Sequence, residues 1–103
     1  IEQWLRSTQD AMISAARTFG ERIGEDERWK MELEKRLYPE GSTRELVRML
    51  TDNINAGPVD LQDPQKVLFV EIIGEYAGFS LLAPDEYLDI NEARVESGMQ
   101  KVY

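Results

Sequence analysis

Residues 66–82 have the sequence KVLFVEIIGEYAGFSLL, and the structure of this stretch decides the fold of the chain. Almost every position in it is apolar, and on a helical wheel Glu71 and Glu75 share one narrow polar stripe. Asp63 and Pro64 precede it as a helix-start signal, because aspartate caps helices and proline suits their first position. The pattern predicts a central helix over residues 66–82 that is buried on most sides.

A strand over residues 67–73 is the alternative, because this part is rich in β-branched and aromatic side chains. We favour the helix for two reasons. The start signal is helical, and we recognise no turn signal between Ile73 and Tyr76.

The first 38 residues predict helical structure with a weak point in the middle. Gly20 and Gly24 disfavour a helix and indicate a kink or a break. Beyond them, Trp29, Leu33 and Leu37 form the apolar stripe of a second helical stretch, which is either separate or, as we favour, a kinked continuation of the first. The apolar stripe of the first stretch comprises Ile1, Leu5, Thr8, Met12, Ala15 and Phe19.

Start signals predict two further helices. Ser42 and Glu45 form a capping box, in which each side chain accepts from the backbone amide of the other residue. Gly57 and Pro58 then stop this helix. Pro84 opens the last helix, on which apolar side chains adjoin an acidic stripe. The acidic stripe consists of Asp85, Asp89, Glu92 and Glu96.

The predicted fold is therefore all-α, a small bundle of four to five helices around a central buried helix at residues 66–82. A length of 103 residues indicates a single helical domain, residues 1–103, with one modest core. The chain starts at Ile1 in a pattern that already looks helical, so we expect a fragment of a longer or processed chain.

The composition disfavours catalysis and metal binding. Histidine and cysteine are both absent, which removes the commonest general base, the usual transition-metal ligands and thiolate zinc sites. Glu71 and Glu75 could supply half of a carboxylate metal site, but we favour a wet helix edge or pairing with Arg44 or Arg48. We expect no enzymatic activity, no catalytic residue, no cofactor and no metal.

The charge is lopsided. The net charge is −8, and residues 51–103 carry ten acidic and three basic side chains, which suggests a basic partner. Bases in the first half alternate with acids, so we expect no direct contact with nucleic acid. No apolar run reaches the roughly 18 residues of a membrane span, so we expect no membrane contact and a cytoplasmic location. The interleaved bases are Arg17, Arg22, Arg28, Lys30, Lys35 and Arg36.

The final predicted helix carries the predicted contact surface. Like charges four residues apart cost a helix about 0.2–0.5 kcal/mol per pair, so a ladder of acids favours a role in recognition. We predict a non-catalytic acidic protein-binding module of immunity-protein, antitoxin, inhibitor or adaptor type that contacts a basic protein. The alternative is a helical structural subunit or assembly factor of a larger viral or bacterial complex. The predicted contact residues are Asp85, Tyr87, Leu88, Asp89, Glu92 and Glu96.

Overall fold

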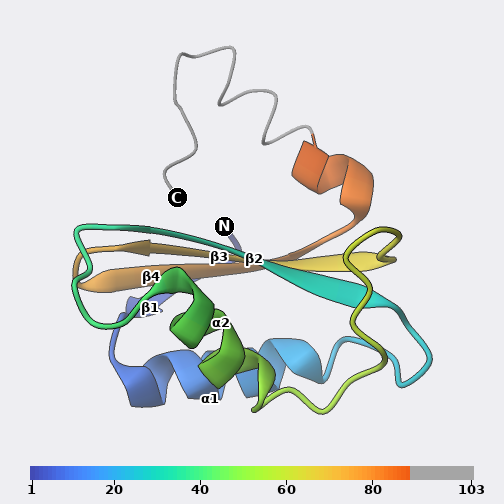
Figure 1. Cartoon of the computed structure of the whole chain (residues 1–103), viewed down its shortest axis with the longest axis horizontal. Coiled ribbons are helices and arrows are strands. Elements are labelled where there is room, and N and C mark those ends of the chain that lie inside the picture. Colours follow the sequence, from blue (N-terminus) through green and yellow to red (C-terminus); the bar gives the residue numbers. More distant parts are fainter. Residues whose placement is uncertain (89–103) are drawn as a thin grey trace.

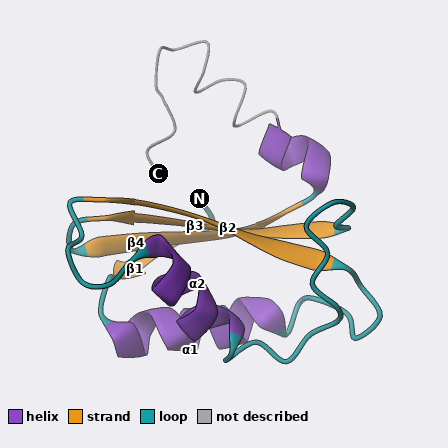
Figure 2. Cartoon of the chain, in the orientation of Figure 1, coloured by secondary structure: helices purple, strands orange, loops and turns teal. Residues whose placement is uncertain are grey.

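The computed structural model describes residues 1–88, in which strands and helices alternate up to a final pair of consecutive strands (Figure 1). In chain order, the elements are β1 (Gln3–Arg6), α1 (Gln9–Gly20), β2 (Trp29–Arg36), α2 (Thr43–Thr51), β3 (Lys66–Ile73) and β4 (Tyr76–Leu82). The strands form one sheet in the order β1-β4-β3-β2, in which β2 and β3 are parallel and the other neighbours antiparallel. Both α1 and α2 lie on one side of the sheet, and a short helix at residues 84–88 lies on the other side (Figure 2).

The stretch that decides the fold is a β-hairpin, so the predicted central helix at residues 66–82 is wrong, and the all-α bundle with it. Ile73 lies opposite Tyr76, and Gly74 and Glu75 form the tight connection between β3 and β4. Gly74 has a φ of 56°, a left-handed conformation that glycine adopts easily in two-residue hairpin loops. The helical prediction does not take Gly74 into account as a turn signal.

The second predicted helical stretch is the strand β2, so that prediction is also wrong. Trp29 and Leu33 are four residues apart, a spacing that puts two side chains on one side of a strand as well as of a helix. Both are buried, whereas Lys30 and Glu32 between them are only partly buried. Met31 between them also packs, partly buried, against the main apolar cluster, so every second side chain of this strand faces the core.

The first predicted helix is correct only in its second half. Thr8 caps α1, where its hydroxyl accepts from the Ala11 amide at 3.3 Å. Residues 3–6 instead pair with β4 as an edge strand. The helix ends at Gly20, at the point where the glycines predict a break.

The start of α2 confirms the predicted capping box. The Ser42 hydroxyl accepts from the Glu45 amide at 3.1 Å, and the Glu45 carboxylate accepts from the Ser42 amide at 3.5 Å. The helix ends at Thr51, before the predicted stop. Asp63 and Pro64 lie in the loop that leads into β3 and start no helix.

Two apolar clusters lie on opposite faces of the sheet. In the main cluster, Phe19 of α1 stacks on Phe79 of β4 with ring centroids 5.8 Å apart. On the other face, Tyr87 of the 84–88 helix packs on Phe69, with ring centroids 5.9 Å apart. Because β3 is covered on both faces here, its sequence is a continuous apolar run instead of an alternating one. The main cluster includes Met12, Phe19, Leu46, Leu50, Leu68, Val70, Ile72 and Phe79.

The last predicted helix begins at Pro84, as the sequence predicts, and its described part covers residues 84–88. The rest of that predicted helix lies outside the described residues. Within residues 1–88, no helix is long and apolar enough to cross a membrane.

Candidate functional site

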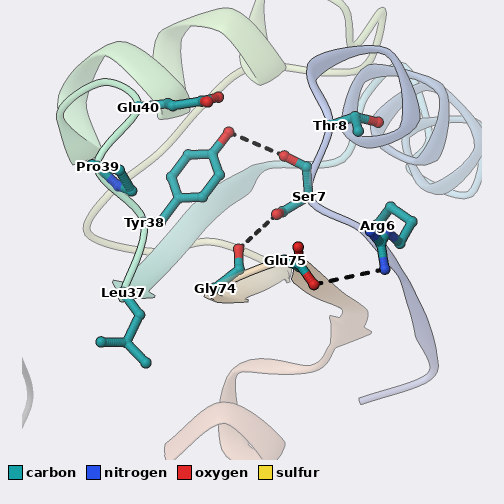
Figure 3. A pocket seen from close by; sticks show the side chains of 9 residues that line it. All are labelled: Arg6, Ser7, Thr8, Leu37, Tyr38, Pro39, Glu40, Gly74 and Glu75. Carbon is teal, nitrogen blue, oxygen red and sulfur yellow. Dashed lines mark hydrogen bonds and ion pairs between the residues drawn. The ribbon is translucent and has the colours of Figure 1, made fainter.

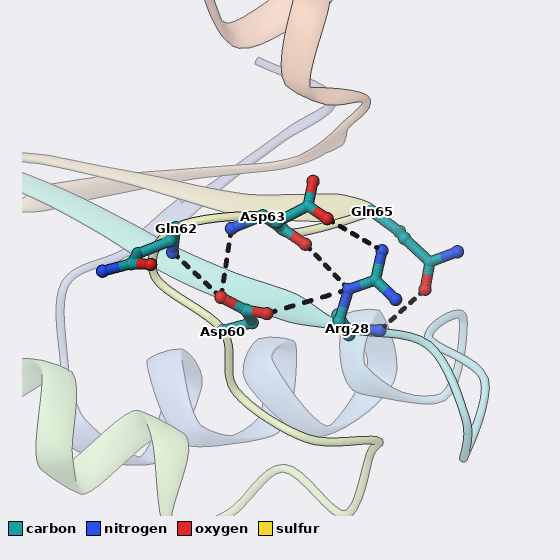
Figure 4. Close-up of polar contacts among 5 residues, drawn as sticks. All are labelled: Arg28, Asp60, Gln62, Asp63 and Gln65. Carbon is teal, nitrogen blue, oxygen red and sulfur yellow. Dashed lines mark hydrogen bonds and ion pairs between the residues drawn. The ribbon is translucent and has the colours of Figure 1, made fainter.

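The basic side chains of residues 1–88 divide into those that pair with a carboxylate and those that do not. Arg28 belongs to the first group: its Nε donates to the Asp63 carbonyl at 2.8 Å, and its Nη2 lies 3.3 Å from the Asp63 carboxylate (Figure 4). Because these contacts hold the loop before β3, Arg28 is engaged within the protein. The other paired cations are Arg6, Arg22, Lys30 and Lys66.

Asp60 organises the same loop. One of its carboxylate oxygens accepts from the amides of Asp63 and Gln62, both at 3.0 Å, and the other lies 3.8 Å from Arg28 (Figure 4). The two amides and then the guanidinium lower the pKa of the Asp60 carboxyl from its ordinary value of 3.8. The charges in this loop therefore satisfy one another.

The remaining cations have no carboxylate partner within the described part of the chain. Two of them follow one another along α2: Arg44 and Arg48 are exposed, whereas Leu46 and Leu50 bury the opposite side of the helix. Four residues correspond to about 6 Å of helix rise, so the two guanidinium groups can reach successive groups of one ligand. The members of this second group are Arg17, Lys35, Arg36, Arg44 and Arg48.

Arg17 extends this arrangement past the end of α2. It lies in the last turn of α1, and its Nη2 donates to the Asn53 side-chain oxygen at 2.9 Å, two residues after α2 ends. The two helices of this layer thus carry three exposed cations that make no ion pair with a described carboxylate. We name Arg17, Arg44 and Arg48 the α2 row.

Lys35 and Arg36 add two cations at the end of β2, at the edge of the sheet. Consecutive strand residues point to opposite faces. Lys35 faces the helices, where its Nζ donates to the Gly41 carbonyl at 2.9 Å. Arg36 faces the side of the sheet opposite to α1 and α2, which we call the open face, and it is in register with Ile73. Because β2 is an edge strand, this edge carries a cation on each face.

A pocket with a volume of about 330 Å³ lies where the end of β1, the segment after β2 and the β3–β4 turn meet (Figure 3). The Tyr38 hydroxyl donates to the Ser7 carbonyl at 3.1 Å, and the Ser7 hydroxyl donates to the Gly74 carbonyl at 2.7 Å. Burial and then the charge of Glu40 raise the pKa of Tyr38, which keeps its hydroxyl protonated as a donor. These bonds tie the three segments together.

The carboxylate pair predicted on one helical stripe is divided between two elements. Glu71 lies within β3, and Glu75 lies in the hairpin turn, 3.9 Å from Arg6. The predicted partners Arg44 and Arg48 lie on α2 and pair with neither. Within residues 1–88, no three side chains of the kinds that bind metals come together.

Only part of the predicted contact surface falls in the described chain. Tyr87 is buried against Phe69, so its ring belongs to the second apolar cluster. Asp85 and Leu88 are exposed on the same short helix. A contact role for this helix stays a prediction. The residues outside the described chain are Asp89, Glu92 and Glu96.

Sequence reasoning missed the α2 row, although the signal for it was present. Once the capping box places the start of the helix at Ser42, Leu46 and Leu50 define its inner side. At 100° per residue, Arg44 and Arg48 then fall on the outer side. Because bases and acids alternate along the linear sequence, the shared position of Arg44 and Arg48 on the outer side of the helix was not recognised.

Solved structures with the same fold include a THUMP domain and parts of two larger proteins. The THUMP domain of THUMP domain-containing protein 1 matches with a TM-score of 0.61 and 23% identity, over 75% of this chain and 88% of that one. TrmN from Thermus thermophilus matches with a TM-score of 0.59 and 16% identity, over 78% of this chain and 26% of that one. A 4-thiouridine synthetase in a complex with RNA and bound ATP matches with a TM-score of 0.53 and 22% identity, over 72% of this chain and 20% of that one.

The chain thus corresponds to nearly all of an isolated THUMP domain, but to about a quarter of TrmN and a fifth of the synthetase. No protein-family profile matches the sequence, and no curated protein matches it. At these identities the likeness establishes the fold alone.

This fold corrects the functional predictions. The acidic protein-binding module, the helical assembly subunit and the absence of nucleic-acid contact were inferred from a helical bundle with interleaved charges. These predictions are wrong, because the chain has the α/β fold of a THUMP domain, and a synthetase with this fold occurs in a complex with RNA. Charges that alternate along the sequence are also separated in space by the sheet and the helices.

Proposed function

We propose that this chain is an RNA-binding domain with the THUMP fold. The observation that carries the proposal is the α2 row, in a fold that the 4-thiouridine synthetase presents in its RNA complex. Phosphate groups are bound by lysine and arginine side chains that neighbouring carboxylates do not already neutralise. Arg17, Arg44 and Arg48 satisfy this condition within the described chain.

The net charge of −8 sets a condition on this proposal. An acidic surface repels RNA at long range, so binding depends on places where cations are separated from acids. Arg22, Arg28 and Lys30 pair with carboxylates locally, whereas the cations of the α2 row form no ion pair with a described carboxylate. We expect weak binding with a steep dependence on salt.

The proposed role is binding without catalysis. The chain lacks histidine and cysteine, and the hydroxyls of Ser7 and Tyr38 are engaged in structural hydrogen bonds. We propose that any chemistry on the bound RNA is performed outside residues 1–103. A cytoplasmic location is compatible with this role and stays a prediction.

Fluorescence anisotropy with a labelled stem-loop RNA at several salt concentrations tests the proposal. Arg44→Gln and Arg48→Gln should each weaken binding and reduce the slope of log K against log salt by about 0.7–0.9. Arg22→Gln is the matched control, because it removes the same charge from a guanidinium that already pairs with Glu2 at 2.9 Å.

Two results would contradict the proposal. If the control weakens binding as much as Arg44→Gln does, only the net charge matters and the α2 row is no contact. If the unaltered chain does not bind the stem-loop even at low salt, the domain is not an RNA-binding module.

A further inference from the structure

One row of side chains crosses all four strands on the open face, beside the β3–β4 turn. The register places Arg36 next to Ile73, Ile73 next to Tyr76 and Tyr76 next to Arg6. Neighbouring strands are about 4.8 Å apart, so the two arginines bracket an apolar centre. Of the described helices, α1 and α2 lie on the opposite face, and the helix at residues 84–88 packs on this face at Phe69 (Figure 1). Ile73 is 39% and Tyr76 51% exposed, although both have large apolar side chains.

Trp4 enlarges this surface by one row. It is in register with Gly78, and a Cβ at position 78 would lie 3.0 Å and 3.1 Å from two carbon atoms of its indole. The missing side chain at Gly78 therefore lets the indole rest against the sheet. Trp4 is still 50% exposed, so the rest of the ring is available to a ligand.

Arg6 is held beside Tyr76. Its guanidinium carbon lies 5.2 Å from the centre of the tyrosine ring, and its Nη1 donates to the tyrosine hydroxyl at 3.3 Å. Its contact with the Glu75 carboxylate is long, at 3.9 Å, and both side chains are exposed (Figure 3). Exposed ion pairs contribute little, so an anionic ligand can replace this one.

From this arrangement we infer that the open end of the sheet is a stacking platform for unpaired nucleotides. We name Trp4, Arg6, Arg36, Ile73 and Tyr76 the open-face platform. Aromatic faces stack on any base, while flanking arginines bind the phosphates on either side. A duplex keeps its bases stacked inside, so it cannot use such a surface. The inference rests on the proposed RNA binding and narrows it to RNA with single-stranded parts.

The neighbouring charges define where the RNA backbone can lie. Glu34 and Glu71 lie in the same cross-strand row as Gly78 and Trp4, next to the row that runs from Arg36 to Arg6. The cations Arg36 and Arg6 lie at the two ends of that neighbouring row, so we place the RNA backbone along it. Lys35 lies on the other face at the β2 edge, where its Nζ donates to the Gly41 carbonyl just before α2.

Tryptophan fluorescence provides a direct test, because the chain has two tryptophans and one cannot reach a ligand. Trp29 is 2% exposed, and its Nε1 donates to the Gly57 carbonyl at 2.8 Å. Titration with a short oligoadenylate should therefore quench Trp4 alone. A blunt-ended RNA duplex should bind, as seen by anisotropy of a labelled strand, without quenching.

Substitutions at the platform distinguish a loss of fluorescence quenching from a loss of affinity for oligoadenylate. Trp4→Phe should abolish the quenching but keep most of the affinity, because phenylalanine still stacks. Trp4→Ala should weaken oligoadenylate binding by about tenfold and leave duplex binding unchanged. Tyr76→Leu, which keeps an apolar side chain in the strand, should also weaken oligoadenylate binding. Leu61→Ala is the matched control, because Leu61 is an exposed apolar residue in the loop before β3 and not on the platform.

The outcomes distinguish the two proposals. If neither RNA binds at low salt, the proposed function fails and the platform with it. If the duplex binds through Arg44 but oligoadenylate neither quenches Trp4 nor depends on it, the platform alone is wrong. If Trp4→Ala abolishes self-association in sedimentation experiments while oligoadenylate affinity is unchanged, the surface is a protein contact and the inference is also wrong.

Discussion

Gly57 lies so close to the backbone before β2 that even a methyl group does not fit. In a Gly57→Ala variant, the new Cβ would overlap with the carbonyl oxygen of Glu27 and lie 2.7 Å from that of Glu25. Both atoms belong to the main chain and cannot rotate away as a flexible side chain does. One of the two backbone segments must therefore move.

The size of the destabilisation depends on the hydrogen bonds that would be disturbed when the backbone at Gly57 moves. Its carbonyl accepts from the buried Trp29 indole at 2.8 Å, and the Pro58 carbonyl accepts from the Trp29 amide at 3.1 Å. Overpacking costs about 1–3 kcal/mol, and a lost bond to a buried donor adds about 1 kcal/mol. We expect the free energy of unfolding to fall by about 2–4 kcal/mol, which lowers the melting temperature by about 10–30 °C.

Urea denaturation followed by circular dichroism measures this change. Gly24→Ala is the matched control, because the nearest atom to its Cβ would be a side-chain oxygen of Glu27 at 3.5 Å, an ordinary contact. If Gly57→Ala changes stability by less than about 0.5 kcal/mol, or no more than the control, the close approach of the two segments is refuted.

Two further predictions concern polar contacts. Ser42→Ala should cost about 1 kcal/mol in urea denaturation, because it removes the cap of α2, and an unchanged midpoint would contradict the capping role. Because the pKa of Asp60 is lowered in the folded state, its charge stabilises the fold above its ordinary pKa of 3.8, and this contribution disappears as the pH falls through the lower folded value. The stability difference between the unaltered chain and Asp60→Asn should thus be constant near neutral pH and shrink below pH 3.8, and a difference that does not depend on pH would contradict this.

Local signals in the sequence identify helix ends better than they identify strands. Capping at Ser42, the break at Gly20 and the start at Pro84 are short-range effects, because each depends on backbone groups within one turn. The structure confirms all three. Such signals place helices that exist, but they do not show which apolar stretches form a sheet.

The strands β2 and β3 were not predicted from the sequence, for two physical reasons. In β2, Trp29 and Leu33 satisfy both the helical and the strand period, so their spacing does not distinguish the two. In β3, burial on both faces removes the alternation that marks a strand, and only Gly74 indicates the turn. The open-face platform depends on cross-strand register, so no local pattern could reveal it. The exposure of Arg44 and Arg48, in contrast, follows from the start of α2 alone.

The strand order has a consequence for how the protein is made. Within residues 1–88, β1 pairs only with β4, and the Glu2 amide donates to the Ser80 hydroxyl, 78 positions further along the chain. Contacts between such distant residues form late, because a long loop must close first. During synthesis, the first strand therefore has no partner until the last strand has left the ribosome. The exposed Trp4 and the bare edge of β1 are then a site of misassociation, and rapid completion of the β3–β4 hairpin removes that hazard.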